Sequence, residues 1–229
     1  GEWGAVVNML ADRLGRVMQR IAGATQRAGR AQNTVRLVTV SKTQTAPAIR
    51  EAFSAGARIF GENYAQELRE KQAALVDLAA SWHFVGRLQK NKAKDVVGRV
   101  ALVHSIDSLE LAAVLDRRAS LAGIVQDVLL EVNLAGEATK AGFTAHAVTP
   151  ALAAVGLLRG LRCVGLMTMP PPTARPEDNR PFFRALAALA ARHGLAELSM
   201  GMSDDFEIAI EEGATLVRIG TAIFGARGQ

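Results

Sequence analysis

Short apolar runs alternate with amphipathic stretches along most of the chain, after a longer opening segment with helical spacing. In the first 30 residues, apolar side chains recur every three or four positions and so share one face of a helix: Val6, Leu10, Leu14, Val17 and Ile21. Most charged side chains lie outside that face. Gly29 is a typical helix stop. We therefore predict one amphipathic helix within residues 1–30, packed on the rest of the protein.

Eight later runs have the length and composition of buried β-strands. They begin near Val35, Arg58, Trp82, Val100, Val125, Leu161, Leu198 and Leu216. Helix-like segments lie between them, at residues 46–55, 64–78, 90–97, 109–121, 145–157, 181–193 and 204–212. Alternating strands and helices indicate a parallel sheet, and eight such units favour an α/β (β/α)₈ barrel of the TIM type, which takes ~250 residues. A doubly wound open sheet is the alternative. No composition shift marks a linker, so we expect residues 1–229 to form a single domain.

Sequence fingerprints of several common sites are missing. No GxGxxG follows the first strand, and neither GxxxxGK[ST] nor GxSxG occurs. Their absence argues against dinucleotide, P-loop and hydrolase sites. No set of His, Cys, Asp or Glu has zinc or calcium spacing, so we expect no metal site.

The composition narrows the class of protein. Apolar residues make up 49% of 229 residues, enough for a substantial core, and the net charge of +5 favours anionic ligands. No apolar run approaches the roughly 20 residues that span a bilayer, and no signal-peptide pattern opens the chain. The one cysteine, Cys163, lies in a predicted strand and is interpreted as an inert core thiol. We expect a cytoplasmic protein without membrane contact, whose first residue, Gly1, leaves open a processed start.

Lys42 ends the first predicted strand, and the carboxyl ends of barrel strands are where ligands bind. A lysine desolvated at such a site loses its proton more readily, and a neutral amine can form a Schiff base with an aldehyde. Taken by itself, the stretch favours a lysine that marks the end of the strand and points into water.

Small and hydroxyl residues follow the last two predicted strands, where barrels often bind phosphate. Ser203 stands beside a helix start, and the backbone N–H groups of Gly220 and Thr221 could approach an anion closely. Ordinary capping and turn chemistry is the alternative, and it is favoured if these residues are taken alone.

Three further features follow the second and third strands. Asn63 could cap a helix or contact a ligand, and His83 is either a ligand contact or a hydrogen-bonded core residue. The basic run at residues 87–94 could attract nucleic acid, but it has no aromatic residue on which bases could stack. A solvated helix face is the favoured interpretation of that run.

The chain resembles one known family in the order of its short motifs. The matching segments are VSKT (40–43), FGENYAQE (60–67), WHFVG with LQ and NK (82–92), HSIDS (104–108), GLMTM (165–169), GMSDD (201–205) and VRIGTAIFG (217–225). In this order they resemble the pyridoxal phosphate homeostasis, or PROSC-type, family over about residues 35–227. The chain departs from the family pattern at Leu134 and Ala135, where a more polar pair is usual, and at Lys90.

The resemblance implies a site for pyridoxal 5′-phosphate (PLP) in a fold-type III barrel like the N-terminal domain of alanine racemase. It implies that Lys42 carries PLP as a Schiff base. By analogy, Arg218 would face the pyridine nitrogen. The remaining residues that the resemblance implies are Ser203, Gly220 and Thr221 at the phosphate and Asn63, His83 and Met167 near the ring.

The resemblance further implies a PLP carrier or regulator without robust catalysis, with PLP and apo PLP-dependent enzymes as partners. Two features support this expectation. An arginine at the pyridine nitrogen keeps its own proton, which weakens PLP as an electron sink. The one tyrosine, Tyr64, follows the second strand, and the chain stops soon after the eighth, so a racemase's second base is not expected. A weakly active racemase or lyase is the alternative. A lone barrel favours a monomer, and nucleic-acid binding is not expected.

Overall fold

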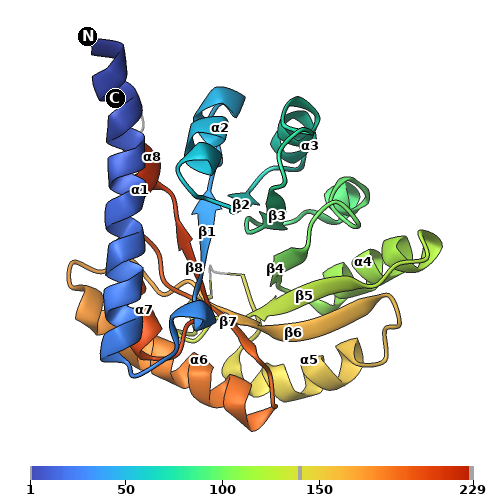
Figure 1. Ribbon diagram of the computed structural model, residues 1–229. Coiled ribbons are helices and arrows are strands. Elements are labelled where there is room, and N and C mark those ends of the chain that lie inside the picture. Colours follow the sequence, from blue (N-terminus) through green and yellow to red (C-terminus); the bar gives the residue numbers. More distant parts are fainter. Residues whose placement is uncertain (1, 139–140, 227–229) are drawn as a thin grey trace.

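The computed structural model describes residues 2–138 and 141–226 and contains a closed barrel of eight parallel strands in sequential order, β1-β2-β3-β4-β5-β6-β7-β8 (Figure 1). The strands are β1 (Arg36–Val40), β2 (Ile59–Glu62), β3 (Ser81–Phe84), β4 (Leu102–Ile106), β5 (Gln126–Glu131), β6 (Leu161–Met167), β7 (Glu197–Ser199) and β8 (Leu216–Ile219). β1 pairs with β8 to close the barrel. The predicted (β/α)₈ fold is confirmed, and each strand begins within two residues of its predicted start.

Helices form the outer layer of the barrel. They are α1 (Glu2–Arg27), α2 (Ala46–Ser54), α3 (Ala65–Ala74), α4 (Leu109–Leu121), α5 (Val148–Val155), α6 (Arg180–Arg192), α7 (Phe206–Glu211) and α8 (Thr221–Phe224), with short 3₁₀ turns η1 (Gln32–Thr34), η2 (Lys90–Asp95), η3 (Ala145–Ala147) and η4 (Pro176–Asn179). The helix expected at residues 90–97, which takes in part of the basic run, is instead the 3₁₀ turn η2. The sequence also did not predict α8, because it spans only one helical turn.

Local sequence signals explain where the helices begin. Thr45 Oγ1 accepts a hydrogen bond from the Ala48 N–H at 3.2 Å, and Pro47 occupies the first turn of α2. Ser108 Oγ accepts from the Leu111 N–H at 3.1 Å and caps α4 in the same way. These caps place the connections after β1 and β4 at the carboxyl edge of the barrel.

The predicted N-terminal helix is confirmed as α1, which packs against α2, α7 and α8. Its apolar stripe is buried at Leu10, Leu14, Val17 and Ile21. Gly1 and the side chain of Val6 lie outside the part of the chain that is described. Arg13 Nε donates to the Ile223 carbonyl at 2.7 Å, so α1 is tied directly to α8 at the end of the barrel strands.

Two apolar layers follow from the two-residue period of the strands. One face of the strands packs under the helices in the larger core. The other face fills the barrel interior with a smaller cluster: Val38, Val85, Leu102, Leu129, Met167 and Leu216. Within the described residues no helix is both long and apolar enough to cross a membrane.

Candidate functional site

Lys42 lies two residues beyond β1 and is exposed at the carboxyl edge of the barrel. Val38 and Val40 belong to the interior cluster, and the alternation of a strand continues from them to Lys42. Val38 pairs with Arg218 of β8, and Val40 pairs with Gly61 of β2. This register places Lys42 beside the ends of β8 and β2.

The residues after β7 and β8 form a corner next to this edge. Thr221 Oγ1 donates to Ser203 Oγ at 3.1 Å, and the Ala222 N–H donates to the same oxygen at 3.3 Å. A Cβ atom on Gly220 would lie 3.1 Å from the Val40 carbonyl oxygen, so glycine permits the close approach of β8 to β1. The structure therefore brings Ser203, Gly220 and Thr221 together as the sequence predicted, at the start of α8.

Arg218 is buried under this corner, with 4% of its surface exposed. Its Nη1 donates to Ser199 Oγ at 2.5 Å, and its Nη2 donates to the Thr168 carbonyl at 3.0 Å. Burial lowers the pKa of Arg218 to about 10, while the carboxylates of Glu131 and Asp205 oppose that shift. Arg218 is therefore a cation at neutral pH, held in a fixed orientation.

A chain of buried polar groups continues from Arg218 across the barrel interior. Ser199 Oγ lies 2.8 Å from His104 Nδ1, and His104 Nε2 lies 2.9 Å from His83 Nδ1. Burial lowers the pKa of His83 to about 4 and that of His104 well below its ordinary value. Both rings are therefore neutral at pH 7, so each contact can pair one donor with one acceptor.

The structure buries both His83 and Met167 in the barrel interior. His83 lines a cavity of about 220 Å³ together with Arg36 and Glu197, the first residues of β1 and β7, at the opposite end of the barrel. It reaches Arg218 only through His104 and Ser199. Met167 is fully buried in the interior cluster and forms part of the packing below the site.

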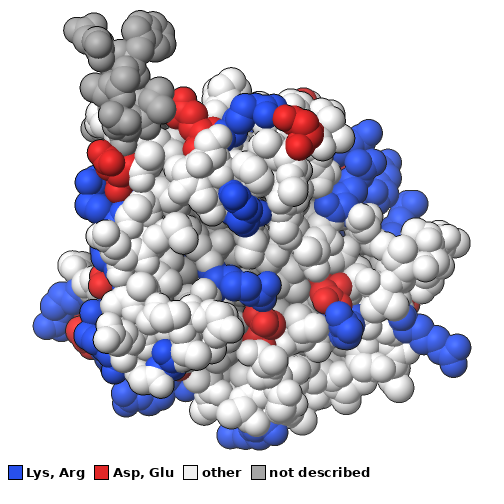
Figure 2. All heavy atoms as spheres, viewed as in Figure 1, with Lys and Arg blue, Asp and Glu red and all other residues white. Residues whose placement is uncertain are grey.

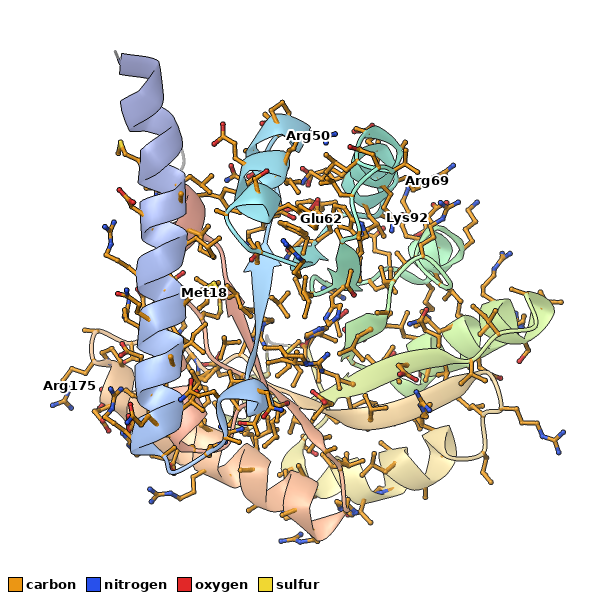
Figure 3. The ribbon with its side chains drawn as sticks, in the orientation of Figure 1. Met18, Arg50, Glu62, Arg69, Lys92 and Arg175 are labelled. Atoms are coloured by element: carbon orange, nitrogen blue, oxygen red, sulfur yellow. The ribbon has the colours of Figure 1, made fainter. Side chains whose placement is uncertain are left out.

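Asn63 follows β2 and lines a cavity of about 500 Å³ with Tyr64, Arg87 and Lys92. Its Oδ1 atom is buried, and no hydrogen-bond partner is found for it among the described residues. Basic side chains gather on the surface over η2 and α3, where Arg69 and Lys92 project outward (Figures 2 and 3). The basic run at residues 87–94 thus forms one wall of this cavity, and most of its residues are exposed.

Sequence reasoning missed three partners of the site, namely His104, Ser199 and the Thr168 carbonyl. The signal of His104 and Ser199 was the inward parity of their strands, which gains meaning only once the barrel is closed, whereas Thr168 follows β6 and contributes through its backbone. The described residues contain no group of His, Cys, Asp and Glu able to hold a metal ion. Cys163 is half-buried, and burial raises the pKa of its thiol, in keeping with the expected inert role.

A family model and curated relatives match this chain over most of its length. The family model "Alanine racemase, N-terminal domain" matches residues 13–228. A pyridoxal phosphate homeostasis protein of Aquifex aeolicus is 47% identical, over 94% of this chain and 97% of the relative. One from Pseudomonas aeruginosa is also 47% identical, over 96% of this chain and 97% of the relative.

Solved structures agree with these relatives. PipY of Synechococcus elongatus with PLP bound superposes with a TM-score of 0.80 at 38% identity, covering 94% of this chain and all of PipY. Its structure without PLP gives a TM-score of 0.82. An alanine racemase of Clostridium difficile gives 0.70 at 14% identity, over 95% of this chain and 58% of the racemase. That last likeness concerns the fold alone.

Proposed function

Because this chain belongs to the family of pyridoxal phosphate homeostasis proteins, which share the alanine racemase N-terminal domain, we propose that it binds PLP as a Schiff base on Lys42 and takes part in intracellular PLP (vitamin B6) homeostasis. The observation that carries the proposal is the convergence of Lys42, the Ser203–Thr221 corner and Arg218 at one edge of the barrel.

The residues at this edge fit the ligand chemically. Ser203 and Thr221 offer hydroxyl groups, and Gly220 leaves backbone accessible, which suits a phosphate group. Arg218 has five N–H donors, of which the contacts with Ser199 and Thr168 use two, and one of the others would serve the pyridine nitrogen. When bound, PLP supplies an aldehyde that condenses with Lys42 Nζ, forming a C=N bond and releasing one water.

We further propose that the chain acts as a carrier or regulator rather than a robust catalyst. Arg218 is a permanent donor, and an arginine at the pyridine nitrogen leaves that nitrogen unprotonated, which weakens the electron sink that amino-acid chemistry needs. Lys42 is exposed, so a second amine could displace it and carry PLP to an apo-enzyme. The names of the relatives accord with this role. A monomeric state, a cytoplasmic location and a lack of nucleic-acid binding stay predictions.

The decisive experiment is a visible absorption spectrum of the protein after incubation with PLP and removal of the excess. Borohydride reduction and peptide mass spectrometry then locate the trapped adduct. We expect a yellow band and an adduct at Lys42, both lost in Lys42→Ala and both kept in Lys94→Ala, an exposed lysine of η2. A wild-type protein that stays colourless, or an adduct unaffected by Lys42→Ala, would refute the proposed site.

A second experiment separates a carrier from an enzyme. Chiral chromatography of alanine and serine incubated with the loaded protein should show no Lys42-dependent racemisation, while an apo PLP enzyme mixed with the loaded protein should regain activity. Robust racemisation that requires Lys42 would overturn the carrier role and favour the racemase alternative.

A further inference from the structure

The backbone on both sides of Lys42 is held by side chains that do not belong to the mouth of the barrel. On one side, Lys71 Nζ donates to the Ser41 carbonyl oxygen at 2.6 Å. On the other side, the Thr43 N–H donates to Glu67 Oε1 at 2.9 Å. The two peptide groups that flank Lys42 are thus fixed to charged groups of α3.

Thr43 has a strained backbone conformation. Its φ angle is +63°, and within the described residues it is the one non-glycine residue with a positive φ. A β-branched side chain is unfavourable in this left-handed region, so such a conformation persists where the surrounding structure holds it. Two local contacts close this turn: the Gln44 N–H donates to the Ser41 carbonyl oxygen at 3.0 Å, and Thr43 Oγ1 donates to the Lys42 carbonyl oxygen at 2.6 Å. The hydrogen bond from the Thr43 N–H to Glu67 then ties the turn to α3.

Glu67 and Lys71 form a cluster of charged side chains with the buried Glu62. Lys71 pairs with Glu62 of β2 and lies 3.4 Å from Glu67, one turn earlier on α3. The side chain of Glu62 is fully buried and that of Lys71 is 7% exposed, so both charges depend on their partners. Figure 3 shows Glu62 near the carboxyl end of β2, below α3.

The cluster lies on the helix side of the strand and not in the ligand mouth. A Cβ atom on Gly61 would meet Val38 and Val85, which both belong to the barrel interior. Gly61 therefore faces inward, and Glu62, its neighbour in β2, faces α3. The cluster therefore contacts the Lys42 segment through its backbone.

We propose that Glu67 is a positioning residue for Lys42 and that it acts by holding Thr43 in the left-handed turn. The buried Lys71–Glu62 pair, which lies beside Glu67, supports it. The turn aims Lys42 along the inner face of β1, beside the ends of β8 and β2. The inference rests on the proposed function, because it explains how the PLP lysine is presented.

The test compares Glu67→Ala with Glu67→Gln, which keeps an oxygen able to accept from the Thr43 N–H. We expect Glu67→Ala to weaken PLP binding at least tenfold and to speed hydrogen exchange at the Thr43 amide at least tenfold in the protein without PLP. Glu67→Gln should stay within threefold of wild type in both. Glu70→Ala, an exposed carboxylate on the same helix, is the matched control and should change neither.

Thr43→Gly distinguishes positioning from a general contribution to stability. Glycine adopts a positive φ without strain, so adding Thr43→Gly to Glu67→Ala should recover most of the lost PLP affinity. A purely structural role for Glu67 would give no such recovery. Unchanged PLP affinity and unchanged Thr43 exchange in Glu67→Ala, or the absence of recovery by Thr43→Gly, would overturn the proposal.

The failure of the proposed function would be distinguishable from the failure of this inference. If wild-type protein takes up no PLP, the proposed function fails. Hydrogen exchange at residue 43 and the coupling of Thr43→Gly with Glu67→Ala in urea unfolding, both measured without PLP, still decide whether Glu67 holds the turn.

Discussion

Acidification should destabilise the protein through the buried imidazole of His83. Burial, with a smaller contribution from Arg36, lowers its pKa from 6.5 to about 4 in the folded state. The unfolded chain therefore binds a proton near pH 6.5, whereas the folded chain excludes it until near pH 4. The stability that results from this difference is fully present above pH 6.5 and is lost as the pH falls from 6.5 toward 4.

The size of the effect follows from the width of the window. A displacement of about 2.5 pH units corresponds to about 3 kcal/mol of unfolding free energy, of which about 2 kcal/mol is lost by pH 5. The ring is only 3% exposed, so solvent screening does not diminish this figure much. His104 contributes in the same direction, because burial and the neighbouring charges also lower its pKa.

Urea unfolding of wild type and His83→Gln between pH 7.5 and 5 measures the effect. Carboxylates elsewhere titrate in both proteins, so the difference between the two unfolding free energies isolates His83. We expect this difference to shift by about 2 kcal/mol in favour of the variant as the pH falls to 5. His146→Gln, at an exposed histidine, is the control variant. A difference between wild type and His83→Gln that stays constant with pH would refute the reasoning.

Three other substitutions test neighbouring parts of the structure by urea unfolding. Burial raises the pKa of Glu62 against the opposing effect of Lys71, so this carboxyl stabilises the folded protein most at low pH and that stability is lost as the pH rises; Glu62→Gln should flatten that dependence, and an unchanged slope would contradict it. Ser199→Ala removes the hydroxyl between a buried guanidinium and an imidazole and should cost about 1–3 kcal/mol of unfolding free energy. Ser105→Ala should cost far less, because no partner for its buried hydroxyl is found among the residues that the structure describes. Gly86→Ala places a Cβ atom 2.6 Å from backbone and should cost about 2 kcal/mol or more, while Gly15→Ala, with open space in α1, should stabilise by about 0.5–1 kcal/mol; equal effects would refute the packing argument.

The order of elements and the position of the central lysine were predictable from the sequence alone. Strands buried on both faces appear as short apolar runs, and amphipathic helices repeat every three to four residues, so both signals are local. Lys42 and Ser203 were found because they come soon after predicted strands, and the carboxyl ends of the strands of a parallel barrel all lie at one edge. The glycine and threonine after β8 were found in the same way.

Closure of the barrel determined which buried polar side chains contact one another, and local sequence patterns do not reveal this. Ser199 and His104 are 95 positions apart, and their hydrogen bond exists because β4 and β7 direct these residues into one interior. The same parity directs His83 of β3 into this interior, where its ring meets that of His104.

The turn after Lys42 is the other feature that only tertiary structure determines. Nothing in the residue type of Thr43 indicates a positive φ, since threonine disfavours it. Glu67 accepts from the Thr43 N–H and Lys71 donates to the Ser41 carbonyl oxygen, contacts that join α3 to the turn across 24 and 30 positions of sequence. Local periodicity specifies which residues are buried, whereas the meeting of distant strands specifies which buried residues touch.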